Sequence, residues 1–278
     1  MNVEINTGAI MIKLELTVSA TVAISALMAI SAASAADLPA HPSYTKAPVY
    51  VAPPVSWNGC YVGGNVGGYW DSFTAGQVAF AGVPSPYIGY GGQNGGGVVG
   101  GGQVGCDYQF ASNFVVGIQG QADFGSIISS NPVAAFPGIT AQFKVSNLET
   151  LTARVGYTVT PAVLAYVKGG VAWTNANGAA VVPAMGGIAG ESANFTMTGY
   201  TIGGGLEWMF APGWSLFGEY NYMDFGTKNV DFPSTGLVPG FGIAGALADT
   251  NAIRLTAQTA LVGVNYRFNW GGPVVAKY

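Results

Sequence analysis

Eight segments between Trp57 and Phe268 each alternate apolar residues with small or polar residues at a period of two. This is the pattern of a β-strand that has an apolar environment on one face and a polar environment on the other. The segments are Trp57–Trp70, Val98–Phe110, Phe114–Phe124, Thr150–Val159, Val163–Trp173, Tyr200–Phe210, Trp214–Tyr222 and Ala260–Phe268. One such segment alone indicates little, but eight in succession predict a sheet of eight strands.

The sixth of these segments shows most clearly how the two faces differ. Ile202, Leu206 and Trp208 lie on one face, whereas Thr201 and Glu207 lie on the other. A strand that separates lipid from a polar lumen needs this division of residues. Aromatic residues also gather near the segment ends, where a barrel wall would meet the membrane surface. They are Trp57, Trp70, Tyr108, Phe110, Trp173, Trp208, Phe210 and Trp214.

The composition excludes most other surroundings for these strands. Hydrophobic residues form 50% of the chain and charged residues only 8%, whereas a soluble domain normally carries about 25% charged residues. After the first forty residues there is no run of about 20 apolar residues, which a membrane helix needs, and 43 glycines disfavour helices. We therefore predict an all-β fold, an eight-stranded antiparallel transmembrane up-and-down β-barrel. The alternative is a soluble β-sandwich, which would expose a more polar face.

The connections between the segments alternate between short and long. Three of them are tight turns, and they span residues 110–114, 159–163 and 210–214. The other four are predicted loops, and they span residues 71–97, 125–142, 175–194 and 224–251. Short periplasmic turns and long extracellular loops are typical of outer-membrane barrels. An even number of strands places both ends of the barrel on one side, which we predict to be the periplasm.

The first 56 residues have a different character from the rest of the chain. Residues 1–35 resemble a secretory signal peptide, with an apolar stretch that ends in Ala33-Ser34-Ala35, a small-residue cleavage site. The alternative is a membrane anchor, for which the stretch is short and diluted by polar residues. Residues 36–56 contain five prolines and are predicted to form an extended periplasmic lead-in. The predicted barrel then spans residues 57–278.

The chain lacks residues that several classes of function require. The only histidine, His41, lies in the proline-rich lead-in, which excludes a hydrolase triad and most metal sites. A net charge of −4 does not favour nucleic acid. Gly95, Gly97 and Gly100 match a dinucleotide-binding spacing, but a strand pattern follows them instead of a helix. We therefore predict no enzymatic activity, no cofactor and no metal.

Nearly all the charged residues of the eight segments lie on the inward face. They are Asp107, Asp123, Arg154, Lys168, Glu207, Glu219 and Arg267. An eight-stranded barrel is just wide enough for side chains to fill its interior, and unpaired buried charge is costly. We predict that these residues form a structural polar plug, with Arg154, Lys168 and Glu219 clustered near mid-height. The alternative is a selectivity lining for a narrow pore.

Two cysteines, Cys60 and Cys106, lie on the outward faces of adjacent predicted strands, near the periplasmic end. The compartment to which the chain would be exported is oxidising, so a cross-strand disulfide forms if the two residues lie opposite each other. The alternative is a pair of small apolar residues that face lipid.

Five short segments resemble the small outer-membrane immunogenic or porin-like proteins of alphaproteobacteria. They are Trp57–Gly64, Gly100–Gly105, Ala153–Tyr157, Glu219–Gly226 and Gly263–Phe268. The resemblance covers Trp57 to Tyr278 and implies an OmpA-like barrel with a role as a surface antigen and in envelope structure. Cys60 and Cys106 depart from the family, which usually has aromatic residues there. Phe217 also departs, because a polar residue is expected at this inward position.

Together these observations predict an outer-membrane β-barrel with a structural and surface-interaction, antigen-like role. The alternative is a small porin-like diffusion channel. The expected partners are outer-membrane lipid, the barrel-insertion machinery, which would recognise Phe268 at the end of the last strand, and a surface partner that the sequence does not identify. No nucleic-acid partner is expected.

Overall fold

The computed structural model describes residues 55–110 and 113–268. The predicted signal peptide and almost all of the predicted lead-in lie outside the described residues. Among the described residues, no helix is long and apolar enough to cross a membrane. The elements are β1 (Gly59–Phe80), β2 (Val83–Phe110), β3 (Phe114–Pro132), β4 (Thr140–Thr160), β5 (Val163–Val182), the 3-10 helix η1 (Pro183–Met185), β6 (Ile188–Ala211), β7 (Trp214–Pro233) and β8 (Leu247–Phe268).

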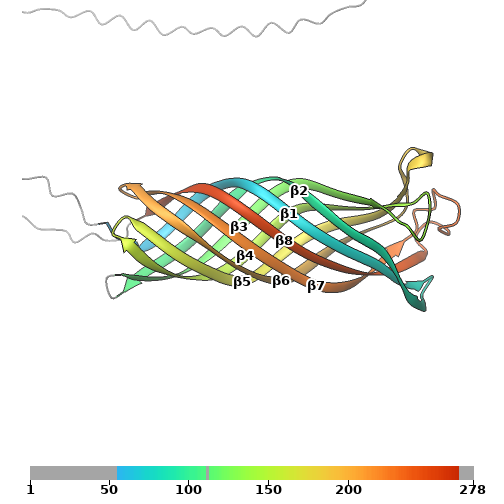
Figure 1. Ribbon diagram of the computed structural model, residues 1–278, viewed down its shortest axis with the longest axis horizontal. Helices are drawn as coiled ribbons and strands as arrows, with labels where there is room; N and C mark the ends of the chain where they lie inside the picture. Colours follow the sequence, from blue (N-terminus) through green and yellow to red (C-terminus); the bar gives the residue numbers. More distant parts are fainter. Residues whose placement is uncertain (1–54, 111–112, 269–278) are drawn as a thin grey trace, which may run out of the picture. The chain divides into compact units, whose positions relative to one another are not determined.

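The eight strands form one closed antiparallel barrel in sequence order, and this confirms the predicted fold. The barrel closes where β1 pairs with β8, with Cys60 opposite Phe268. The strands wind diagonally around the barrel (Figure 1). The start of β1 and the end of β8 therefore lie at the same end, which also carries the short turns at residues 161–162 and 212–213. We call this the turn end, which we expect to face the periplasm.

The predicted faces are also confirmed over the part of each strand nearest the turn end. Leu206 is 60% exposed on the outer wall of β6, whereas Glu207, the next residue, is fully buried inside the barrel. The outward apolar residues continue for about ten residues along each strand, which is the length that a membrane-crossing strand needs. The band ends at a ring of aromatic residues, namely Trp70, Phe124, Trp173 and Tyr200. We call the part between the turns and this ring the membrane section.

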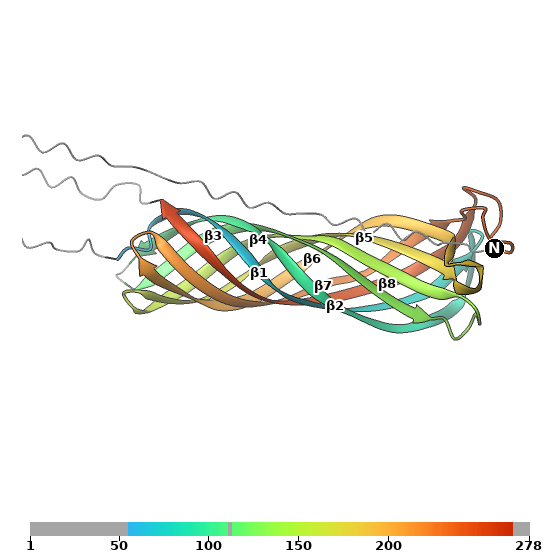
Figure 2. The same ribbon diagram turned by 90° about the horizontal axis from the view of Figure 1, so that it is seen from above.

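The strands continue well beyond this ring, so the four predicted long loops were wrong in extent. The predicted loop at residues 71–97 is almost entirely strand, because β1 runs to Phe80 and β2 starts at Val83. Only Ala81 and Gly82 connect them, both with positive φ, as in a tight hairpin turn. The remaining connections at this end span residues 133–139, 183–187 and 234–246. Figure 2 shows them gathered at the end opposite the turns.

Beyond the ring the pattern of the two faces is reversed. On β1, Ser72 and Thr74 are exposed, whereas Phe73 is fully buried inside the barrel. The interior here is an apolar core that includes Phe143, Ile253 and Leu255. Polar residues outside and apolar residues inside are the arrangement of a barrel surrounded by water. We call this part, with its connections, the outer section.

Candidate functional site

The structure places all seven predicted lumenal charges inside the membrane section. Each is at most 6% exposed, although no lipid surrounds the barrel in this measurement. The side chains are buried by one another and by the barrel wall. They form two groups, which differ in their distance from the turn end.

The first group, near the turn end, contains two cations and two anions from the four even-numbered strands. Arg154 of β4 makes a bidentate contact with Asp107 of β2: its Nε donates to Oδ1 at 2.7 Å and its Nη2 donates to Oδ2. Its Nη1 donates to Oε2 of Glu207 of β6 at 3.1 Å. Nη2 of Arg267 of β8 lies 2.7 Å from Oδ2 of the same Asp107 carboxylate. The formal charge of this group is therefore zero.

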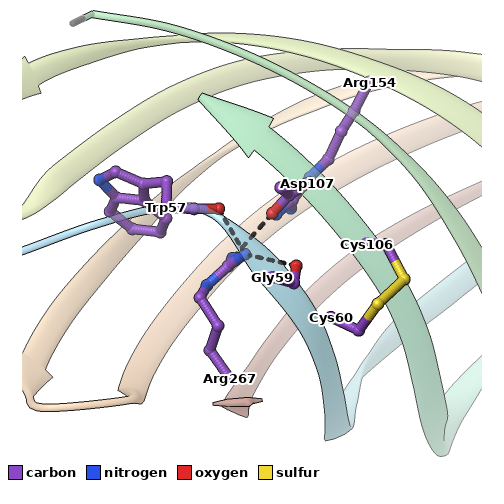
Figure 3. The surroundings of a disulfide bond; sticks show 7 residues. All are labelled: Trp57, Gly59, Cys60, Cys106, Asp107, Arg154 and Arg267. Carbon is purple, nitrogen blue, oxygen red and sulfur yellow. Dashed lines mark hydrogen bonds and ion pairs between the residues drawn. A yellow bond between two sulfur atoms is a disulfide. The ribbon is translucent and has the colours of Figure 1, made fainter. Parts of the chain in front are cut away.

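Aromatic rings enclose the two guanidinium groups. The ring of Tyr61 lies between them. Its centroid is 4.8 Å from Cζ of Arg154 and 5.0 Å from Cζ of Arg267. The ring of Trp57 lies 5.3 Å from Arg267, whose Nη1 donates to the Trp57 carbonyl oxygen at 2.8 Å (Figure 3). Trp57 is fully buried, and its indole N–H donates to the Pro161 carbonyl oxygen across the barrel. These contacts close the lumen at the turn end.

The second group lies nearer the aromatic ring of the membrane section. Nζ of Lys168 donates to Oε1 of Glu219 at 2.8 Å and to Oε1 of Gln121 at 3.1 Å. Gln121 in turn donates to Asp123 at 2.7 Å. The expected cluster of Arg154, Lys168 and Glu219 is thus divided, because the ion pairs of Arg154 are with the first group.

A chain of amide side chains completes the lumenal network. Gln119 donates to Gln103, and Gln103 donates to Asn265, each at 2.7 Å. Asn265 donates to Glu207 of the first group at 3.0 Å, and the Ser215 hydroxyl also donates to Glu207. The alternation places these amides on the inward face, but sequence reasoning missed their role because their partners come from different strands. Their hydrogen bonds connect the inward side chains of β2, β3 and β8 to the first charge group.

Phe217, which departs from the expected polar character, points into the lumen and is 2% exposed. Its ring lies against Gly263 of the neighbouring strand, where an added Cβ would be only 2.5 Å from a ring carbon. The glycine therefore provides the space that admits the ring.

The two cysteines form a disulfide between β1 and β2. Cys60 and Cys106 are direct partners in the register of the two strands, and both belong to the outward face. Figure 3 shows the bond beside Asp107, which points from the same strand in the opposite direction, into the lumen. The disulfide therefore joins the first two strands next to the first charge group.

The outer section closes the lumen a second time, with apolar side chains. Phe73 and Phe143 stack with ring centroids 4.9 Å apart, and Phe195 and Phe232 meet edge to face at 6.4 Å. The described residues hold no group of three or more histidine, cysteine, aspartate or glutamate side chains that could bind a metal. The lumen thus holds a polar plug, in which three cationic side chains face four acidic ones, followed by an apolar plug.

Comparison with known proteins agrees with this architecture. Residues 22–268 match the family model described as an outer membrane protein beta-barrel domain. The chain is 30% identical over 218 residues to the 31 kDa outer-membrane immunogenic protein of Brucella melitensis, a match that covers 77% of this chain and 84% of the relative. The protein of the same name from Brucella suis matches to the same extent.

Solved outer-membrane proteins give more distant matches. OprG from Pseudomonas aeruginosa aligns with a TM-score of 0.49 and 12% identity over 79% of this chain and all of that one. Ail, the attachment invasion locus protein of Yersinia pestis, aligns with a TM-score of 0.35 and 14% identity over 76% of this chain and 99% of that one.

Proposed function

Since this chain belongs to the outer membrane β-barrel domain family and is located in the outer membrane, we propose that it is a closed barrel with a structural and surface-interaction role. In this proposal the membrane section anchors the protein in lipid, and the outer section presents a rigid surface to the cell exterior. The observation that carries the proposal is the double closure of the lumen, by ion pairs in the membrane section and by aromatic rings beyond it.

The energetics of the lumen support a closed state over a channel. An open path would have to separate Arg154 from Asp107 and Glu207, and all three side chains are buried. Breaking a buried ion pair by removing one partner costs about 3–5 kcal/mol. The same path would then have to cross the apolar core of the outer section. A diffusion channel of the selectivity-lining type is therefore the less favoured alternative.

The exterior of the outer section supports a role in surface contact. It carries amide and hydroxyl side chains that bind one another across strands, with Asn177 donating to Asn194 at 2.9 Å and Thr196 to Asn175 at 2.7 Å. This rigid polar wall lies outside the apolar band and is available to water. The Brucella relative is named an immunogenic protein, which supports an antigen-like role here.

The proposal includes the absence of enzymatic activity. The carboxylates of Asp107, Glu207 and Glu219 are each held in an ion pair inside the membrane section. A general base must reach a proton of a bound substrate, and these groups have no such access.

Swelling of proteoliposomes in arabinose tests the closed lumen. Liposomes that contain the folded protein are expected to swell no faster than protein-free liposomes, whereas a known porin at the same protein-to-lipid ratio swells rapidly. A swelling rate that rises with the amount of this protein would contradict the proposal and favour the channel.

Surface presentation needs a separate test in cells. An epitope inserted between Gly240 and Phe241, in the long connection of the outer section, is expected to bind antibody on intact cells. The matched control carries the same epitope between Pro212 and Gly213 at the turn end and is expected to bind only after permeabilisation. The reverse pattern would overturn the assigned orientation.

A further inference from the structure

A pocket of about 480 Å³ opens at the outer mouth of the barrel. It lies between the β1–β2 hairpin and the two connections at residues 133–139 and 234–246. Small-molecule sites typically measure about 300–1,000 Å³ and have mainly apolar walls with a few convergent polar groups. The apolar wall here consists of Phe80, Ile88, Phe136, Ile139, Pro239, Phe241 and Ala248. The size and the lining are thus those of a site for a compact ligand.

Three polar side chains line the same pocket, namely Gln77, Ser85 and Asp249. Asp249 accepts hydrogen bonds from Nε2 of Gln77 at 2.6 Å and from the Tyr90 hydroxyl at 3.4 Å. A carboxylate has about four lone-pair sites, so Asp249 retains capacity for a further donor. The Ser85 hydroxyl is buried and has no hydrogen-bond partner among the described residues. The pocket therefore offers a charged acceptor that a ligand could use.

The charge of this region is negative and has no partner within the described chain. Asp249 forms no ion pair with any described lysine or arginine, and Arg254 of the same strand pairs instead with Asp224 on the outer wall. Nearby Glu191 is 2% exposed, and its Oε2 has no partner among the described residues. Burial and the neighbouring Asp249 raise the pKa of Glu191 to about 8, and burial also raises the pKa of Asp249. No ion pair with a described lysine or arginine offsets the effect of burial on either acid.

We propose that this pocket binds a small organic cation, a compact aromatic amine, with its ammonium group on Asp249 and its ring among Phe80, Phe136 and Phe241. The ammonium would occupy the free lone pairs of the carboxylate and supply the charge that the region lacks. Aromatic walls add to the attraction, because a cation close to a ring face is stabilised by the ring quadrupole. A carboxylate ligand would be repelled by the Asp249 carboxylate.

Three probes with one common ring system test this assignment: phenethylamine, phenethyl alcohol and phenylacetate. Their binding to the full chain, folded in lipid nanodiscs, is measured by titration calorimetry near neutral pH. We expect the amine to bind about 10-fold more tightly than the alcohol, since a hydrogen bond to a charged group is stronger than a neutral one. Phenylacetate is expected not to bind. Equal affinities for amine and alcohol would overturn the proposal.

Substitutions separate the role of the charge from that of the pocket wall. Asp249→Asn is expected to reduce the affinity for the amine to that for the alcohol, whereas Phe241→Ala should weaken both. The matched control is Asp231→Asn, which removes the same charge from an exposed residue of β7 that binds the Thr250 hydroxyl. It should leave amine binding unchanged. An effect of Asp231→Asn equal to that of Asp249→Asn would indicate general surface attraction and contradict the site.

The pH dependence of amine binding gives a second measurement on the unmodified protein. Amine affinity should fall as the pH falls through the raised pKa of Asp249, because the protonated carboxyl group no longer pairs with the ammonium. The titratable groups that face Asp249 are Tyr90 of β2 and Glu191 of β6. Deprotonation of Glu191 above a pH of about 8 should strengthen binding further. Amine binding that does not vary with pH would contradict the proposal.

Discussion

The membrane section and the outer section of this barrel are built from the same eight strands but have opposite faces. In the membrane section Leu206 faces outward and Glu207 inward, whereas in the outer section Thr74 faces outward and Phe73 inward. The same strands continue past the aromatic ring, but their surroundings change there from lipid to water. What surrounds a strand, lipid or water, therefore decides which of its two faces is apolar.

The largest expected effect comes from breaking the charge plug of the membrane section. Asp107→Ala removes the shared partner of Arg154 and Arg267 and should lower the free energy of unfolding by about 3–5 kcal/mol, because two buried cations each lose an ion pair. Urea unfolding in lipid vesicles measures the change. A loss below about 1 kcal/mol would show that the plug does not hold the barrel together.

Lysine substitutions on the outward face test where along the strands the pattern of apolar and polar faces is reversed. Leu206→Lys places a charge against lipid and should cost about 2–4 kcal/mol near the bilayer midplane. The matched change, Thr74→Lys in the outer section, should cost less than about 0.5 kcal/mol, since this position faces water. Equal costs for the two variants in urea unfolding would contradict the division into two sections.

The disulfide is predicted to stabilise the pairing of β1 with β2 in the membrane section. Replacing both Cys60 and Cys106 by alanine should lower the free energy of unfolding by about 2–4 kcal/mol. Thiol titration of the denatured protein gives an independent check, with no free thiol before reduction and two after it. Two free thiols in the unreduced protein would exclude the bond.

In the outer section, the buried Glu191 should make stability depend on pH. Its pKa is raised to about 8 in the folded state, so the folded form binds a proton more tightly than the unfolded form does. Stability is then fully present below the unfolded pKa and is lost as the pH rises through about 8. We expect the free energy of unfolding to change by about 1–3 kcal/mol over this pH range, which is the cost of an unsatisfied buried polar group. Glu191→Gln should remove most of this pH dependence. The urea midpoints at about pH 6 and about pH 9 provide the measurement.

Among the ion-pair substitutions, the smaller effect is expected for a pair on the outer wall. Arg254 and Asp224 lie 3.1 Å apart, but the arginine side chain is 57% exposed. Arg254→Ala should therefore cost less than about 1 kcal/mol, in contrast to Asp107→Ala in the lumen. Added salt should reduce the difference between wild type and this variant. A cost equal to that of the lumenal variant would indicate that burial does not distinguish the two pairs.

The sequence predicts the membrane section well because lipid enforces a strict alternation. Each outward residue there must be apolar and most inward residues are polar, so Ile202 and Thr201 are assigned to the correct faces without a structure. The outer section was predicted as loops because its alternation is reversed and interrupted by glycines. Phe73, for example, is an apolar residue on the inward face of β1, and this face carries polar residues nearer the turn end.

The pairing inside the lumen could not be predicted from the pattern alone. Arg154, Asp107 and Glu207 meet across the barrel from strands that are not neighbours in the sheet, and the stagger of the strands decides which inward residues share a level. The outer pocket depends on three connections that are far apart in sequence. Its acid, Asp249, carries no motif that distinguishes it from other acidic residues near a loop.

The most direct test of the closed lumen is single-channel conductance in a planar bilayer. Insertion must first be shown by the shift in gel migration between unboiled and boiled protein, which a folded barrel displays. We expect the inserted wild-type protein to give no conductance steps. Reproducible ion-selective steps, altered by substitution of Arg154, Lys168 or Glu219, would contradict it and establish the diffusion channel instead.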